Sequence, residues 1–247
     1  MGVTERRRRE KEVRRELAVD AAMRLYDEDG YHAITMEKIA ERSELSRAAL
    51  YLYFKNKEEI MMSAIMAHAD YFASLLQEIY DNRENIKHEL LEKLWGSFQR
   101  FYEKDPVAFT AWQYFHQSET VGGLPEELRN LLYEAGARVV ALQHKIVEYA
   151  VVEKIFIQCD YRALSEVIWS LFLGIVYVER SKNVLSHKDH MAMTQDVAKS
   201  VLLRGVLYAP PKTGAGEGGM DVLSRKVERH KPPEKSRGGK IKFDKEE

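Results

Sequence analysis

The sequence has few cysteines and prolines and no long apolar run. Its single cysteine, Cys159, cannot form a disulfide within the chain or a thiolate cage for a metal, which is typical of a protein of the reducing cytoplasm. The most apolar uncharged run covers residues 167–178, whereas a membrane span needs about 20 residues. No apolar run follows Arg6 to Arg9 at the N-terminus, so no secretory signal is expected. We therefore expect a cytoplasmic protein without a membrane partner.

Enzyme signatures are also scarce. The sequence contains no P-loop, no GxSxG and no HExxH motif, and the charged and apolar fractions are those of a globular protein. His187 and His190 near Asp189 form only a weak metal motif. We expect neither an enzyme nor a bound cofactor or metal.

The formal net charge of -1 hides an uneven distribution of charge. Between Leu45 and Lys57 the chain carries Arg47, Lys55 and Lys57 but no acidic residue. A nucleic-acid partner would therefore be bound by local placement of basic residues, because no long segment is a polycation.

Apolar residues recur at spacings of three and four along almost the whole chain, which predicts an all-α protein. The first helix is expected over residues 7–28, with Gly30 as its C-terminal stop. Thr35, Ser46 and Asn56 are expected N-caps of the next three helices, of which the first two are short. Longer helices are expected over residues 57–80, 84–103, 106–118, 125–153, 160–182 and 189–208.

The pattern divides the chain into three parts: residues 1–60, with three helices in helix-turn-helix proportions, residues 61–209, a larger helical domain, and residues 210–247, a tail. The tail is expected to be flexible because it holds four of the six prolines and a glycine-rich run.

The helix beginning at Ser46 has the position of a recognition helix, whose N-terminal residues reach base edges in the major groove. Arg47 can donate two hydrogen bonds to a guanine, and the small Ser46 and Ala48 permit close approach.

Two runs carry a resemblance to a known family: Thr35-Met36-Glu37-Lys38-Ile39-Ala40, and Ser46-Arg47-Ala48-Ala49-Leu50-Tyr51-Leu52-Tyr53-Phe54-Lys55-Asn56-Lys57. They resemble the TetR family of transcriptional regulators, over about residues 14–62. The resemblance implies that Thr35, Tyr51, Tyr53 and Lys57 contact DNA phosphates. It also implies that residues 1–60 are a DNA-binding domain and that residues 61–209 are a ligand-binding and dimerisation domain. The expected assembly is a homodimer on a palindromic operator, with a small-molecule effector.

Two positions depart from the family pattern. Glu44 stands where glycine is usual in the turn, which would cost on the order of 1 kcal/mol in a left-handed conformation. Leu52 replaces a frequent aromatic residue and could contact a thymine methyl group.

Some residues also have a structural interpretation. Phe54 is expected in the core, whereas Tyr53 fits the core and a phosphate contact equally well. Arg6 to Arg9 could form an arm in a minor groove, but an extended first helix with ion pairs such as Glu5 with Arg9 is slightly favoured.

Aromatic residues are concentrated between residues 95 and 116, where an effector pocket is expected. Its predicted ligand-binding residues are Trp95, Phe98, Phe109, Trp112, Gln113 and His116. The alternative for each aromatic residue is ordinary core packing.

These observations predict a sequence-specific DNA-binding regulator, a repressor that a small molecule releases from its operator. The alternative is a helical ligand-binding or scaffolding protein whose N-terminal module contacts protein instead of DNA.

Overall fold

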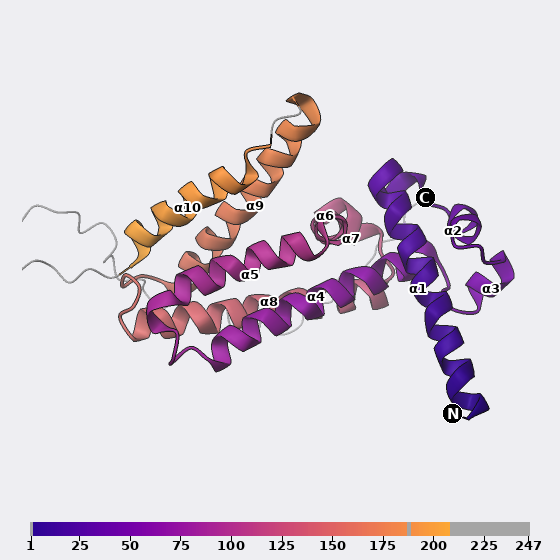
Figure 1. The fold of residues 1–247 in the computed structure, drawn as a ribbon, viewed down its shortest axis with the longest axis horizontal. Coiled ribbons are helices and arrows are strands. Elements are labelled where there is room, and N and C mark those ends of the chain that lie inside the picture. Colours follow the sequence, from indigo (N-terminus) through magenta and orange to yellow (C-terminus); the bar gives the residue numbers. More distant parts are fainter. Residues whose placement is uncertain (1, 187–188, 208–247) are drawn as a thin grey trace, which may run out of the picture. The chain divides into compact units, whose positions relative to one another are not determined.

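The computed structural model describes residues 2–186 and 189–207, and the predicted tail over 210–247 lies outside them. Most of the described residues are helical and the rest form turns and loops, with an isolated bridge between Phe156 and Leu207. The helices of the first part are α1 (Val3–Asp29), η1 (Tyr31–Ala33), α2 (Met36–Arg42), α3 (Arg47–Tyr51) and α4 (Lys57–Asp81). They are followed by η2 (Lys87–Glu89), α5 (Leu90–Lys104), α6 (Pro106–Phe115), α7 (Ser118–Gly123), α8 (Glu126–Val152), α9 (Tyr161–Ser186) and α10 (Met191–Val206) (Figure 1). The predicted all-α fold is confirmed.

Four helix boundaries differ from the prediction by more than two residues, among them the end of α9 at Ser186, where residue 182 was expected. α1 begins at Val3, because Glu5, Arg6 and Arg9 stand at spacings that permit ion pairs along the helix. The helix expected from residue 84 begins at Leu90, because Asn85 donates to the side chain of Asn82 at 2.7 Å and stabilises a turn. The helix expected over 106–118 ends at Phe115, and the short α7 follows.

α4 connects the N-terminal helices with the rest of the described chain, since it packs against α1, α5, α6 and α8. Its N-terminus is fixed by the side chain of Asn56, which accepts a hydrogen bond from the backbone of Glu59 at 2.9 Å. Buried Ile60, Met61 and Ile65 follow at once, so the helix enters the core within its first turn.

An aromatic cluster forms the core beside α4. Phe72 stacks on Phe101 with ring centroids 4.2 Å apart, and Phe98 packs against Trp169 and Phe172. His68 also stacks on Phe101, and its burial lowers the pKa of the imidazole to about 4, so the ring is neutral at pH 7. Apolar burial of this extent is the main source of stability for the bundle.

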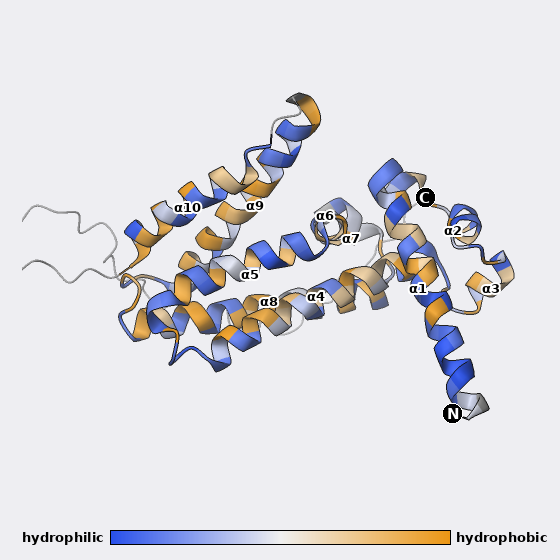
Figure 2. Cartoon of the chain, in the orientation of Figure 1, coloured by the Kyte–Doolittle hydropathy of each residue, from blue (hydrophilic) through white to orange (hydrophobic). Residues whose placement is uncertain are grey.

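α9 and α10 carry apolar residues that the described part of the chain does not cover. Val167 and Val178 on α9 and Val197 and Val201 on α10 are all exposed. Hydrophobic and hydrophilic residues are interspersed along both helices (Figure 2). By length and composition the segment Tyr161–Leu185 could cross a bilayer, but a helix packed within a bundle passes the same test, and α9 packs against α8 and α10.

The turn between α2 and α3 has the backbone strain expected from its sequence. Glu44 has a φ of 56°, the left-handed region that glycine adopts without cost. The amide of Leu45 donates to the carbonyl of Ala40 at 3.0 Å and closes the turn.

We expect Glu44→Gly to raise the free energy of unfolding by up to about 1 kcal/mol, because the left-handed backbone costs roughly that much with a side chain. Chemical denaturation of the two proteins measures the difference. Glu41→Gly, at an exposed position inside α2, is the control and should lower stability by about 1 kcal/mol. Equal loss from both substitutions would contradict the strain at Glu44.

Candidate nucleic-acid interface

The start of each of the two short helices α2 and α3 is fixed by a side-chain cap. The Thr35 hydroxyl accepts a hydrogen bond from the amide of Lys38 at 3.2 Å, and the Ser46 hydroxyl accepts one from Ala49 at 3.1 Å. Both predicted N-caps are confirmed by these bonds. Each capping hydroxyl keeps its own hydrogen. That of Ser46 can donate to DNA while it caps α3, whereas that of Thr35 also bonds the Glu37 carboxylate and would exchange this acceptor for a phosphate.

α3 has an inner and an outer face. Leu50 is fully buried and the following Phe54 is nearly so, which confirms the core role of Phe54. The side chains of Ala48 and Tyr51 are exposed on the other face, and Leu52 after the helix is 77% exposed. Tyr53 is only half-buried, and its carbonyl accepts a bond from Arg15 at 3.4 Å. The residues predicted to meet DNA on α3 are therefore free of the core.

Arg47, the first residue of α3, is 58% exposed and forms an ion pair with Glu37 of α2 at 2.7 Å. A hydrogen bond with Tyr51 and the charge of Glu37 raise the pKa of Arg47 above its usual value. The guanidinium is thus held on the outer surface by side chains on both sides, where it remains open to solvent.

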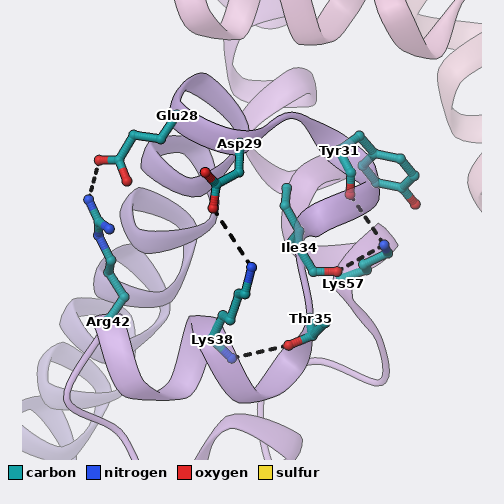
Figure 3. Close-up of polar contacts among 8 residues, drawn as sticks. All are labelled: Glu28, Asp29, Tyr31, Ile34, Thr35, Lys38, Arg42 and Lys57. Carbon is teal, nitrogen blue, oxygen red and sulfur yellow. Dashed lines mark hydrogen bonds and ion pairs between the residues drawn. The ribbon is translucent and has the colours of Figure 1, made fainter.

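Lys57, the first residue of α4, lies against η1 instead of projecting freely (Figure 3). Its ammonium group donates to the carbonyl of Ile34 at 3.0 Å and of Tyr31 at 3.3 Å, and lies 4.3 Å from the centre of the Tyr31 ring. An ammonium group has three hydrogens, so one donor is left for a phosphate. Sequence reasoning missed these two bonds, because nothing in a local pattern signals a contact 23 or 26 residues away.

Two ion pairs hold α2 against the end of α1. Lys38 lies 3.7 Å from Asp29, and Arg42 is paired with Glu28 (Figure 3). Each pair is exposed and is worth at most about 1 kcal/mol. The two pairs connect α2 directly to the end of α1.

Arg6, Arg8 and Arg9 are part of α1 and form ion pairs with acidic residues of the same helix. The pair between Glu5 and Arg9 is present at 3.7 Å, whereas Glu10 is paired with Arg6. The helical extension is therefore the conformation that the structure shows for this segment.

Among the residues predicted to bind a ligand, Phe109, Gln113 and His116 line one open groove between α6 and α9, with a volume of about 950 Å³. We call it the α6–α9 groove. Trp95 and Phe98 are fully buried in the aromatic core and do not line it, and Trp112 packs against His116 with ring centroids 4.1 Å apart. Tyr114, which follows Gln113 in the predicted pocket region, also lines the groove.

In the described part of the chain no group of three or more His, Cys, Asp or Glu side chains is arranged to hold a metal ion. His187 of the weak histidine motif lies outside the described residues.

Comparison with known proteins gives a family for this arrangement. Residues 18–64 match the family model described as bacterial regulatory proteins, tetR family. Over these residues the chain is similar to the TetR family. A fatty acid metabolism regulator protein of Bacillus subtilis is 33% identical over 72 residues, which cover 29% of this chain and 37% of the relative. The chain spans about two-fifths of the length of the curated relatives it matches first.

Solved structures agree in fold over a longer part of the chain. The fatty acid degradation regulator FadR of Bacillus halodurans has a TM-score of 0.63 at 23% identity, covering 78% of this chain and 95% of its own. The SmeT–triclosan complex has the same TM-score at 18% identity and covers 84% and 100%. The fold shared with these structures therefore extends beyond α4 into the helices that follow.

Within this TetR-type domain, we expect Lys57→Met to lower the free energy of unfolding by about 1–2 kcal/mol. Hydrogen bonds from a charged group contribute about 1.5–3 kcal/mol to stability, and their loss is partly offset. Removal of a positive charge from a helix N-terminus stabilises the helix by about 0.3–1 kcal/mol. Urea denaturation checks the value. Lys55→Met is the matched control, because Lys55 is 77% exposed, and should change stability by less than about 0.5 kcal/mol. Indistinguishable losses from Lys55→Met and Lys57→Met would show that the bonds of Lys57 contribute nothing.

Proposed function

We propose that the chain is a sequence-specific DNA-binding transcriptional regulator that acts as a homodimer. The observation that carries the proposal is the outer face of α3, where Arg47, Ala48 and Tyr51 are exposed directly after the Ser46 cap. The match of residues 18–64 to the TetR family model favours DNA over protein as the partner of this module.

Each predicted contact has a role in this proposal. Arg47 donates to a guanine edge, with Ser46 and Ala48 beside it. Tyr51, Tyr53, Thr35 and Lys57 position the domain on phosphates.

To contact a base, the Arg47 guanidinium must break its ion pair with Glu37 or bond to Glu37 and the base at the same time. An exposed ion pair is worth about 0–1 kcal/mol, whereas a bidentate contact with guanine gives about 1–3 kcal/mol of discrimination. The exchange therefore favours the base contact.

The exposed apolar residues of α9 and α10 supply the dimer interface in this proposal. Val167, Val178, Met193, Val197 and Val201 define what we call the dimer surface. Residues 167 and 178 are eleven apart on α9, and 193, 197 and 201 are four apart on α10, so each set lies along one face of its helix. A two-fold partner covers such a surface and places a second α3 about 34–36 Å away, one turn of DNA.

The effector in this proposal is a small molecule that releases the repressor from its operator. The α6–α9 groove has the volume of a ligand site, and Tyr114 from its lining contacts His32, next to α2. Occupation of the groove can therefore bias the position of the DNA-binding helices.

Selection of bound fragments from random genomic DNA tests the function. We expect a palindromic sequence, and we expect Arg47→Ala to lose about 10- to 100-fold in affinity for it and to accept other bases at one position of each half-site. Arg129→Ala, an exposed change on α8, is the control and should bind as the wild type does. Failure to enrich any duplex would instead support the protein-binding alternative.

A further inference from the structure

The α6–α9 groove contains one strong positive charge and no negative one. Arg180 of α9 is half-buried and lines the groove, whereas no aspartate or glutamate does. Among the described residues no carboxylate lies within ion-pair distance of Arg180. A guanidinium that is partly removed from water without a counter-charge has free energy to gain from an anion.

The surroundings of Arg180 are mainly apolar. Leu173, Tyr177 and Val184 lie on the same face of α9 as Arg180, at spacings of three and four, and Phe109 faces the groove from α6. This face adjoins the one that carries Val167 and Val178, because Gly174 and Leu185 of the groove lie seven residues after them, so the groove borders the dimer surface along α9.

We propose that the α6–α9 groove binds a small amphipathic anion, with an alkyl chain against its apolar walls and a carboxylate or phosphate head on Arg180. The groove volume of about 950 Å³ lies within the range of small-molecule sites. Arginine pairs with either head through two parallel hydrogen bonds, so the two head groups share one recognition chemistry. Binding of this ligand to the groove does not depend on the proposed function. Only the effect of the ligand on DNA binding rests on that function.

The same groove is connected to the DNA-binding helices through Tyr114. The hydroxyl of Tyr114 lies 3.2 Å from Nε2 of His32, and its ring centroid lies 5.4 Å from that of Tyr31. A ligand in the groove therefore touches the residue that joins α6 to η1. A change in the position of Tyr114 on binding would alter the preferred placement of α2 and α3.

Binding of four single-chain probes to the full-length protein tests the class of ligand: laurate, dodecyl phosphate, dodecanol and dodecyltrimethylammonium, each below the concentration at which it forms micelles. Titration calorimetry gives the dissociation constants. We expect the tighter anion to bind at least tenfold more tightly than dodecanol and the cation to bind least, and the order of laurate and dodecyl phosphate identifies the head group. Equal affinity for dodecanol and both anions would overturn the proposal.

Matched variants locate the site. Arg180→Gln should weaken anion binding about tenfold or more and leave dodecanol binding unchanged, whereas Arg162→Gln, an exposed arginine on the same helix, should change neither. Gln113→Trp should fill the groove and reduce binding of all chains, and Glu103→Trp, on the exposed side of α5, should not. Circular dichroism and light scattering confirm that each variant keeps its fold and oligomeric state. Wild-type affinity for the anions in Arg180→Gln would refute the site.

Release of the selected duplex separates the two proposals. A saturating anion should release the wild type and not Arg180→Gln. If no duplex is ever selected but anion binding depends on Arg180, the groove proposal holds and the proposed function fails. If the duplex is bound and no anion binds, the groove proposal fails alone.

Discussion

Tyr31 is the residue on which the placement of the recognition helix depends, because it joins three parts of the chain at one point. Its hydroxyl donates to Glu58 of α4 at 2.6 Å, and its carbonyl accepts from Lys57. Its ring packs against Phe115 of α6 at 5.0 Å. Burial and the bond to Glu58 raise the pKa of the phenol, so it stays protonated and remains a donor.

The contacts of Tyr31 affect both the helix-turn-helix and the α6–α9 groove. Thr35 caps α2 four residues after Tyr31, so the start of the helix-turn-helix follows the position of η1. On the other side, Tyr114 and Phe115 belong to the helix that forms one wall of the α6–α9 groove. A single aromatic cluster therefore links the DNA-facing helices to the groove, and no long chain of intermediates is needed.

Local interactions made much of the fold predictable from sequence. The caps at Thr35, Ser46 and Asn56 depend on residues three positions away, and the strained turn at Glu44 depends on one backbone angle, so pattern and residue type suffice. The outer face of α3 follows in the same way from the burial of Leu50 and Phe54.

Contacts between segments far apart in sequence could not be predicted from these local patterns. The bonds of Lys57 to Tyr31 and Ile34, and the split of the aromatic residues between core and groove, are decided by packing of helices far apart in sequence. No sequence feature distinguishes Trp95 from Phe109 as a ligand-binding residue, yet only Phe109 lines the groove. The sequence did not indicate a binding role for Arg180, because its distance from any carboxylate is set only when α6 and α9 pack together.

Hydroxyl-radical footprinting on a selected duplex tests most directly the central claim that two copies of α3 occupy one operator. The wild type should protect two patches related by symmetry and centred about one helical turn apart. Val197→Glu places a charge on the exposed face of α10, and it should remove the paired footprint while the chain stays folded. A single unpaired patch for the wild type, or an unchanged double footprint for Val197→Glu, would contradict the account.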